Sequence, residues 1–277
     1  SRIIEGMAHL GVVVAVPTLI VGATAERHQP IALTLWGTFF GVSFALLNWL
    51  GLSLVDRFGV PALFWGHAAY MALSALVLSP RLSFGGAVAA VRVSLWKQHL
   101  SIYRSPRISA PGLGWLFYTF CFLSLLTLLP PYLEPQSRRW VMGAIPLVSI
   151  LASMTLGILL LRRIQAVNVV IIGFVGAALA SLALAAIPGD PALCLVLAAA
   201  FGLVQGASYA AVPQLNRVPA DMALANGGLS QAGNLGNTLG TPVLLSVLMV
   251  GGYAGMMTAI AISLVFGALV HLWLARQ

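Results

Sequence analysis

Three ionisable side chains near the start of the sequence are spaced so that they can act together. Arg2, Glu5 and His9 are separated by three and four residues, which places them on one face of an α-helix. An arginine in this position attracts an anionic group of a solute, and a neighbouring carboxylate or imidazole can take up a proton. The alternative is that Arg2 and Glu5 form an ion pair with a structural role.

A second polar pattern is a row of amides and hydroxyls far along the chain. Its members follow at steps of four, four, three and four residues, again one helical face: Asn226, Ser230, Asn234, Asn237 and Thr241. Uncharged groups of this kind bind a solute through hydrogen bonds, and we expect Ser230, Asn234 and Asn237 to do so. The alternative is that the row joins neighbouring helices through interhelical hydrogen bonds.

Polar groups in two other apolar stretches could complete a site for a solute. Tyr118 belongs to one of these stretches, and Gln205 and Tyr209 belong to the other. Taken alone, each of them is better explained by packing inside a helical bundle.

The sequence contains no pattern that would support catalysis. His-Glu-x-x-His, Gly-x-Ser-x-Gly and a phosphate-binding glycine loop are all absent, and the six acidic residues lie mostly in short hinges. Both cysteines lie inside apolar stretches, without a pairing pattern. We therefore expect no enzymatic activity, no cofactor and no metal site.

The elements that carry these side chains are apolar stretches long enough to cross a bilayer, which takes roughly 20 helical residues. Charged residues make up 7% of the chain, against about 25% in soluble domains, and the mean hydropathy is +0.99. Because helices satisfy their own backbone hydrogen bonds in lipid, we predict an all-α membrane protein. Its nine predicted transmembrane helices are 3–23, 31–53, 60–79, 112–133, 140–161, 167–187, 192–212, 224–248 and 253–275.

Basic residues are distributed unevenly over the hinges between these spans. One set of alternate hinges, together with the C-terminus, carries ten Lys and Arg residues, and the other set carries three. By the positive-inside rule the first set is cytoplasmic, so we expect an integral protein of the bacterial inner membrane. The net charge of +8 is spread over hinges rather than gathered in a basic domain, which argues against nucleic acid as a partner. We expect the lipid bilayer and a small-molecule substrate as partners, and a monomer.

The longest hinge, 80–111, divides the chain. It carries five basic residues and a series of apolar residues at helical spacing, so we expect part of it to lie on the inner membrane surface as an amphipathic helix. The alternative is a solvated linker held near anionic headgroups by charge alone. We assign 1–79 to a partial N-terminal bundle of three helices, 80–111 to a cytoplasmic linker and 112–277 to a six-helix C-terminal bundle. The apolar series is Phe84, Val88, Val91, Leu95 and Ile102.

A weak internal repeat relates the two bundles. Glu5-Gly6-Met7-Ala8-His9 opens the first span, Gln205-Gly206-Ala207-Ser208-Tyr209 lies in the seventh, and a proline and an acid follow each. Parallel repeats of this kind are a transporter architecture. A repeat unit of six helices gives twelve in total, so we expect that this chain lacks the first three.

Two segments resemble the major facilitator superfamily. Arg2-Ile-Ile-Glu5-Gly6-Met7 is similar to the Arg-x-x-Gln-Gly-small pattern of the family's fourth helix, and Gly202–Pro242 resembles helices ten and eleven. The resemblance covers the whole chain as helices four to twelve, and it implies a substrate or proton-coupling role for Arg2. Two segments depart from the family: Gly37–Gly41 lacks the Gly-Pro end of the antiporter pattern, and Leu161 replaces an acid in the hinge before Arg162.

The resemblance and the two-bundle organisation together indicate a secondary active transporter. It would move a small solute by alternating access between the bundles, with protons as a candidate coupling ion. A receptor or scaffold that does not transport anything could have the same fold. A channel is disfavoured, because a continuous pore does not need two repeats with glycine-rich, kinked helices.

Overall fold

The structure is a computed structural model that describes residues 2–80 and 94–276, and this part of the chain is helical without any strand. The first group of elements is α1 (Arg2–Ala23), η1 (Glu26–His28), α2 (Gln29–Gly37), α3 (Phe39–Leu46), η2 (Leu47–Gly51), α4 (Leu52–Phe58) and α5 (Pro61–Leu78). The second group is α6 (Leu95–Arg104), α7 (Pro106–Leu128), η3 (Pro130–Tyr132), α8 (Pro135–Ala152), η4 (Ser153–Gly157), α9 (Ile158–Leu161), α10 (Ala166–Ala186), α11 (Pro191–Leu215) and α12 (Pro219–Leu274).

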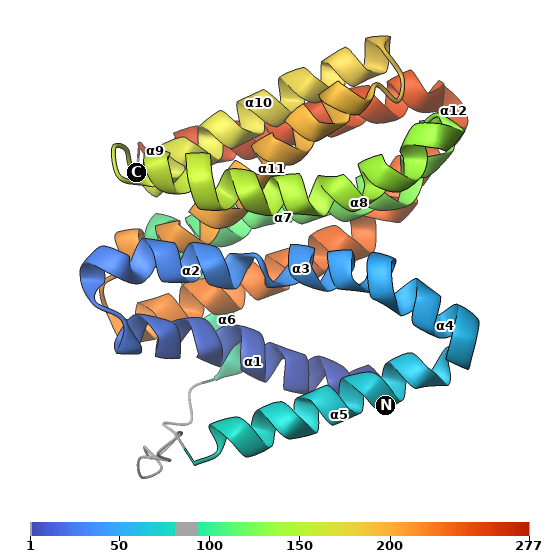
Figure 1. Cartoon of the computed structure of the whole chain (residues 1–277). Coiled ribbons are helices and arrows are strands. Elements are labelled where there is room, and N and C mark those ends of the chain that lie inside the picture. Colours follow the sequence, from blue (N-terminus) through green and yellow to red (C-terminus); the bar gives the residue numbers. More distant parts are fainter. Residues whose placement is uncertain (1, 81–93, 277) are drawn as a thin grey trace.

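The long helices run roughly side by side in two groups. In Figure 1, α1–α5 lie on one side, below α8, α10 and α11. The largest fully buried side chains include Tyr118, Phe122, Phe174 and Phe201, which belong to α7, α10 and α11. The core therefore lies in the second group. The division into bundles of 1–79 and 112–277 stays a prediction.

Local sequence signals define where the helices begin. Proline is the first residue of α5, α7, α8, α11 and α12, a position where its fixed φ suits the helix and its missing N–H is not needed. Asp190 caps α11, because its Oδ1 accepts a hydrogen bond of 2.8 Å from the backbone N–H of Leu193. Gly59 and Gly189 turn the chain before α5 and α11 with φ values of 78° and 68°, which favour glycine.

Many apolar side chains on the outside of the molecule face the surroundings rather than a core. No residue of α5 is buried, and Trp65 and Leu76 on this helix are 77% and 71% exposed. In water such a surface would be costly, whereas lipid accommodates it. The medium around the described helices is therefore a bilayer.

Among the described residues, seven helices are long and apolar enough to cross a membrane, so the predicted count of nine is not confirmed. They are Ile4–Ala23, Pro61–Leu78, Pro106–Leu128, Pro135–Leu161, Ala166–Ala186, Pro191–Leu215 and Pro219–Leu274. The last covers two predicted spans, 224–248 and 253–275. It changes direction at Gly252, whose backbone has φ 63° and ψ −168°.

Several predicted boundaries differ from the structure, and two of the differences change an element. The span predicted at 31–53 is divided among α2, α3, the π-helical turn η2 and α4. The first break follows Gly37, where the Thr38 hydroxyl donates to the carbonyl oxygen of Leu35 and competes with the helical pattern. The second boundary is the start of α7, which begins at Pro106 inside the range assigned to the linker. Residues 84, 88 and 91 of the linker's apolar series lie outside the described residues.

Glycines let α7 and α12 approach each other closely. A Cβ added to Gly236 would lie 2.2 Å from Oγ1 of Thr119, and one added to Gly240 would lie 2.2 Å from the carbonyl oxygen of Phe120. Small residues at such crossings bring backbones together and increase van der Waals contact in lipid. One polar contact reinforces this crossing, because the Thr241 hydroxyl donates to the Ser124 hydroxyl at 3.4 Å.

We predict that Gly236→Ala destabilises the protein by about 1–3 kcal/mol, because the added methyl group has no room against α7. The measurement is thermal unfolding of the purified protein in mild detergent. Gly227→Ala is the matched control on the same helix, since a Cβ at Gly227 meets no atom within 4 Å. Equal melting temperatures for the two variants would contradict the proposed close packing.

Candidate functional site

A small cavity of about 80 Å³ lies where α1 and α3 meet α7, α11 and α12. We call it the inner cavity. Its lining residues come from both groups of helices: His9, Val13, Phe39, Trp115, Tyr118, Thr119, Phe122, Tyr209, Leu229, Ser230, Gly233, Asn234 and Asn237. Six of the nine residues predicted from the sequence are in this lining. They are His9, Tyr118, Tyr209, Ser230, Asn234 and Asn237.

Two polar atoms in the lining have no partner. Oδ1 of Asn237 and the hydroxyl of Tyr118 are buried, and neither makes a hydrogen bond within the described residues. Ser230 differs, because its hydroxyl donates to the carbonyl oxygen of Asn226 at 3.0 Å. A buried polar group without a partner costs about 1–3 kcal/mol. A solute or water that bonds to Asn237 and Tyr118 would recover this energy.

Aromatic rings form much of the remaining wall. The ring centroids of Trp115 and Tyr118 are 4.6 Å apart, those of Trp115 and Tyr209 are 5.0 Å apart, and those of Tyr118 and Phe122 are 5.2 Å apart. Sequence reasoning did not select Trp115, although it lies one helical turn before Tyr118 and that spacing could have identified it. Phe39 and Phe122 carried no such signal, because apolar residues occur throughout the chain.

The inner cavity is almost free of formal charge. Among its described lining residues there is no Asp, Glu, Lys or Arg, and His9 is the one histidine. Glu5 lies one turn before His9 on α1 but is exposed and outside this lining. The backbone of Arg2 begins α1, and its side chain lies outside the described residues. Of the predicted group, His9 lines the inner cavity and Glu5 does not, and the role of Arg2 stays a prediction.

Gln205 is placed differently from the prediction. Its side chain is 2% exposed, and Nε2 donates a hydrogen bond to the carbonyl oxygen of Gly37 on α2. The Ser149 hydroxyl donates to Oε1 of Gln205 at 3.4 Å. Close by, the Thr34 hydroxyl donates to the carbonyl oxygen of Gly206 at 3.4 Å. Gln205 thus joins α2 to α11 and α8, and it does not line the inner cavity.

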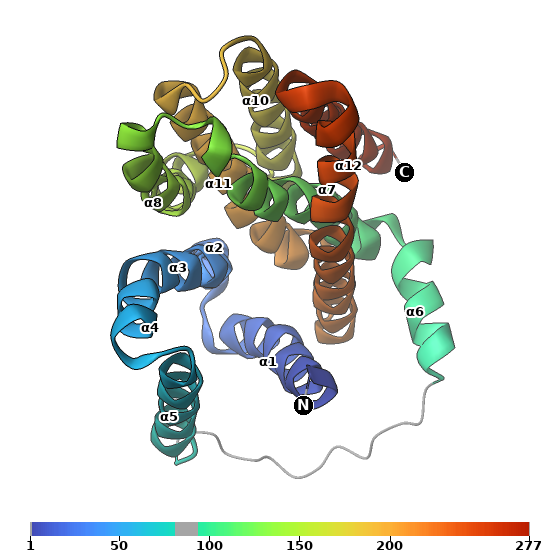
Figure 2. The same ribbon diagram turned by 90° about the vertical axis from the view of Figure 1, so that its right-hand side faces the viewer.

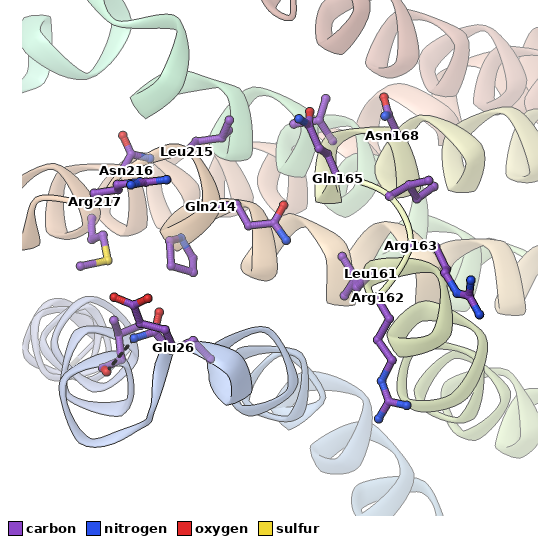
Figure 3. Close-up of a pocket in the computed structure, with 16 residues that line it drawn as sticks. Glu26, Leu161, Arg162, Arg163, Gln165, Asn168, Gln214, Leu215, Asn216 and Arg217 are labelled. Carbon is purple, nitrogen blue, oxygen red and sulfur yellow. Dashed lines mark hydrogen bonds between the residues drawn. The ribbon is translucent and has the colours of Figure 1, made fainter.

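A larger cavity of about 990 Å³, which we call the vestibule, lies near one end of the bundle (Figure 3). Its lining combines three hinges: 24–30, 162–166 and the segment that follows α11. Figure 3 shows Glu26 on one side of the vestibule, facing Arg217, with Arg162 and Arg163 further along the opposite wall. The labelled lining residues are Glu26, Leu161, Arg162, Arg163, Gln165, Asn168, Gln214, Leu215, Asn216 and Arg217.

The vestibule marks the end of the molecule where basic hinges gather. The side-chain N–H of Asn216 donates to the carbonyl oxygen of Arg107 at 3.1 Å, so the start of α7 lies beside the vestibule. At the opposite end, the Tyr253 hydroxyl accepts a hydrogen bond of 3.4 Å from the backbone N–H of Gly189, and its ring contacts Tyr132. The charge asymmetry read from the sequence therefore corresponds to two distinct ends of the bundle.

Several membrane-crossing helices in two groups, with cavities between them, define an integral membrane protein of the polytopic helical class. The profile of the Major Facilitator Superfamily matches residues 1–217, and the chain belongs to this family. No curated protein matches the chain in sequence.

A solved structure supports the same fold. The chain is similar to a Major Facilitator Superfamily transporter, FucP, determined in the outward conformation, with a TM-score of 0.67 and 15% sequence identity. The match covers 94% of this chain and 72% of the other. At this identity the similarity establishes the fold and leaves the solute to be inferred from the cavity itself.

We predict that Gln205→Leu lowers stability by about 1–3 kcal/mol, because it leaves the carbonyl oxygen of Gly37 and the hydroxyl of Ser149 without their buried partner. Thermal unfolding in mild detergent measures the change. Gln136→Leu, at an exposed position of α8, is the control and should have little effect. If Gln205→Leu is as stable as the control, the contact between α2 and α11 does not depend on this side chain.

Proposed function

We propose that this protein is a secondary active transporter that moves a small solute by alternating access, with the solute held in the inner cavity. The observation that carries the proposal is the meeting of His9, from the first group of helices, with Asn234 and Asn237, from the second group, around one cavity. Because both groups contribute residues to this cavity, its shape changes when the groups move relative to each other. Solute binding and the movement of the groups are therefore coupled.

The contacts between the groups support a state that is open at the vestibule. Gly37 faces the ring of Tyr209, and Gly41 faces Ile150 of α8, so the groups touch along α2 and α3. At the vestibule, by contrast, Glu26 and Gln29 of the first group line an open cavity. We propose that the vestibule faces the cytoplasm and that this arrangement is the inward-facing state. The basic hinges at this end support that orientation.

The chemistry of the inner cavity favours a neutral or weakly acidic solute. Asn237 and Tyr118 offer hydrogen bonds, and the rings of Trp115 and Tyr209 offer apolar surface. A strongly charged solute would lose its hydration without gaining a fixed countercharge from the lining residues, which is costly. The cavity of about 80 Å³ has room for a few water molecules, so it must widen when a solute enters.

We predict that Asn234→Leu weakens solute binding by about fivefold to 150-fold, because a solute polar group loses its partner, at a cost of about 1–3 kcal/mol. A panel of neutral, acidic and basic small solutes is first tested for thermal stabilisation of the purified protein. Any solute that binds is then measured by counterflow in proteoliposomes. Gln231→Leu, an exposed position on the same helix, should leave binding unchanged.

Two outcomes would contradict the proposed transport function or the proposed site. Binding without counterflow in sealed vesicles would indicate a receptor or scaffold with this fold instead of a transporter. Unchanged counterflow in Asn234→Leu would show that the Asn234 side chain does not bind the solute. The proposed transport function would still be supported.

We predict that His9→Gln abolishes accumulation driven by a pH gradient and leaves solute counterflow intact, because glutamine keeps hydrogen bonding and cannot carry a proton. For one coupled proton, a gradient of one pH unit supports about tenfold accumulation. His67→Gln, exposed on α5 and outside the inner cavity, is the matched control. Equal accumulation by His9→Gln and wild type would exclude His9 as the coupling group.

A further inference from the structure

The helix α6 has an orientation that sets it apart from the membrane-crossing helices. Figure 2 looks nearly along the bundle, so that most helices are seen close to end-on, and α6 runs across the view at the rim. It leads directly into α7 at Pro106, beside the vestibule, where Arg107 is bonded to Asn216. A helix that lies across the end of a membrane bundle is placed at the level of the lipid headgroups.

One side of α6 packs on the bundle. Ile102 is buried, and its Cγ2 lies close enough to Gly228 of α12 that a Cβ there would meet it at 2.8 Å. This contact fixes the rotation of α6 about its own axis. The side chains that face other directions are therefore presented in a defined way.

Among the described residues, none covers a second apolar side of α6 completely. Trp96, Leu100 and Tyr103 are 73%, 38% and 44% exposed, and helical geometry places them about 100° to 160° around the helix axis from Ile102. The ring of His99 lies between those of Trp96 and Tyr103, with centroid distances of 5.9 Å and 5.1 Å. The result is a continuous apolar and aromatic strip along the helix.

Two cations border this strip. Lys97 and Arg104 are exposed and lie seven residues apart, on the same helical face, next to Trp96 and Tyr103. Indole and phenol rings prefer the membrane–water interface, and each Lys or Arg near an anionic surface contributes about 1 kcal/mol of attraction. We define Trp96, Lys97, Leu100, Tyr103 and Arg104 as the α6 outer face.

We propose that the α6 outer face binds the anionic surface of the bilayer and anchors the connection between the two groups of helices to it. Trp96, Leu100 and Tyr103 enter the headgroup and upper acyl region, while Lys97 and Arg104 contact phosphate groups of anionic lipids. The occupant is the bilayer that surrounds the described spanning helices, and the charge of the face selects its anionic lipids. This binding does not depend on the identity of the transported solute.

The test places the full chain in vesicles of phosphatidylcholine with a minority of phosphatidylglycerol, with bromine on the acyl chains of one lipid or the other. Bromine quenches nearby tryptophan, and the difference between wild type and Trp96→Phe isolates the signal of Trp96. We expect several-fold stronger quenching per lipid from brominated phosphatidylglycerol than from brominated phosphatidylcholine. The preference should shrink at high salt, which screens exposed charges.

Paired charge variants show whether the α6 outer face causes the preference. Lys97→Gln combined with Arg104→Gln should remove most of this several-fold preference, because both cations contribute to the attraction of anionic lipid. Arg162→Gln combined with Arg163→Gln removes the same charge at the same end of the bundle, away from α6, and should leave the preference intact. Trp65→Phe on α5 reports a lipid-facing indole outside the proposed face.

Three results would overturn the proposal. Equal quenching of Trp96 by both brominated lipids would mean that α6 does not select anionic lipid. Absence of quenching by either lipid would mean that Trp96 faces water or protein. If both double charge variants lose the lipid preference equally, the preference comes from the total positive charge at this end of the bundle. It would then not come from the α6 outer face.

Discussion

The close crossing of α7 and α12 is the contact on which the rest of the structure depends. In lipid the hydrophobic effect does not draw helices together, so their association relies on packing and on hydrogen bonds. Gly236 and Gly240 allow the two backbones to meet, and Thr241 adds a bond to Ser124. The same crossing brings the amide face of α12 against the aromatic side chains of α7. Stability and the candidate site thus arise from one interface.

Much of the fold can be predicted from hydropathy, because a helix that crosses a bilayer needs a long apolar stretch and satisfies its own backbone hydrogen bonds. The predicted spans at 3–23, 167–187 and 192–212 agree closely with α1, α10 and α11. The break of α2 at Thr38 was not predictable in the same way. It depends on a local hydroxyl bond and on packing against α11, and neither changes the average hydropathy of the stretch.

The candidate site was predictable where polar residues keep helical spacing. Ser230, Asn234 and Asn237 form one face of α12, and the structure places all three on the inner cavity. The hydrogen-bond partners of Gln205 could not be predicted from its own helix. Its partner is the backbone oxygen of Gly37, more than a hundred residues away, and only the tertiary fold brings them together. The positions of Val13 and Leu229 in the cavity lining could not be predicted for another reason. A sequence does not distinguish apolar residues that face lipid from those that face a cavity.

The separation between charged ends and a nearly neutral interior constrains how a solute can cross. A charge moved into the inner cavity loses hydration at a cost that only a countercharge can offset. Under the proposed function, a neutral solute would meet this condition with an uncharged imidazole at His9. A weakly acidic solute that enters as its anion would need a protonated imidazole there, and it would then cross with one proton. In this proposal, the one imidazole among the described lining residues links the charge of the solute to proton stoichiometry.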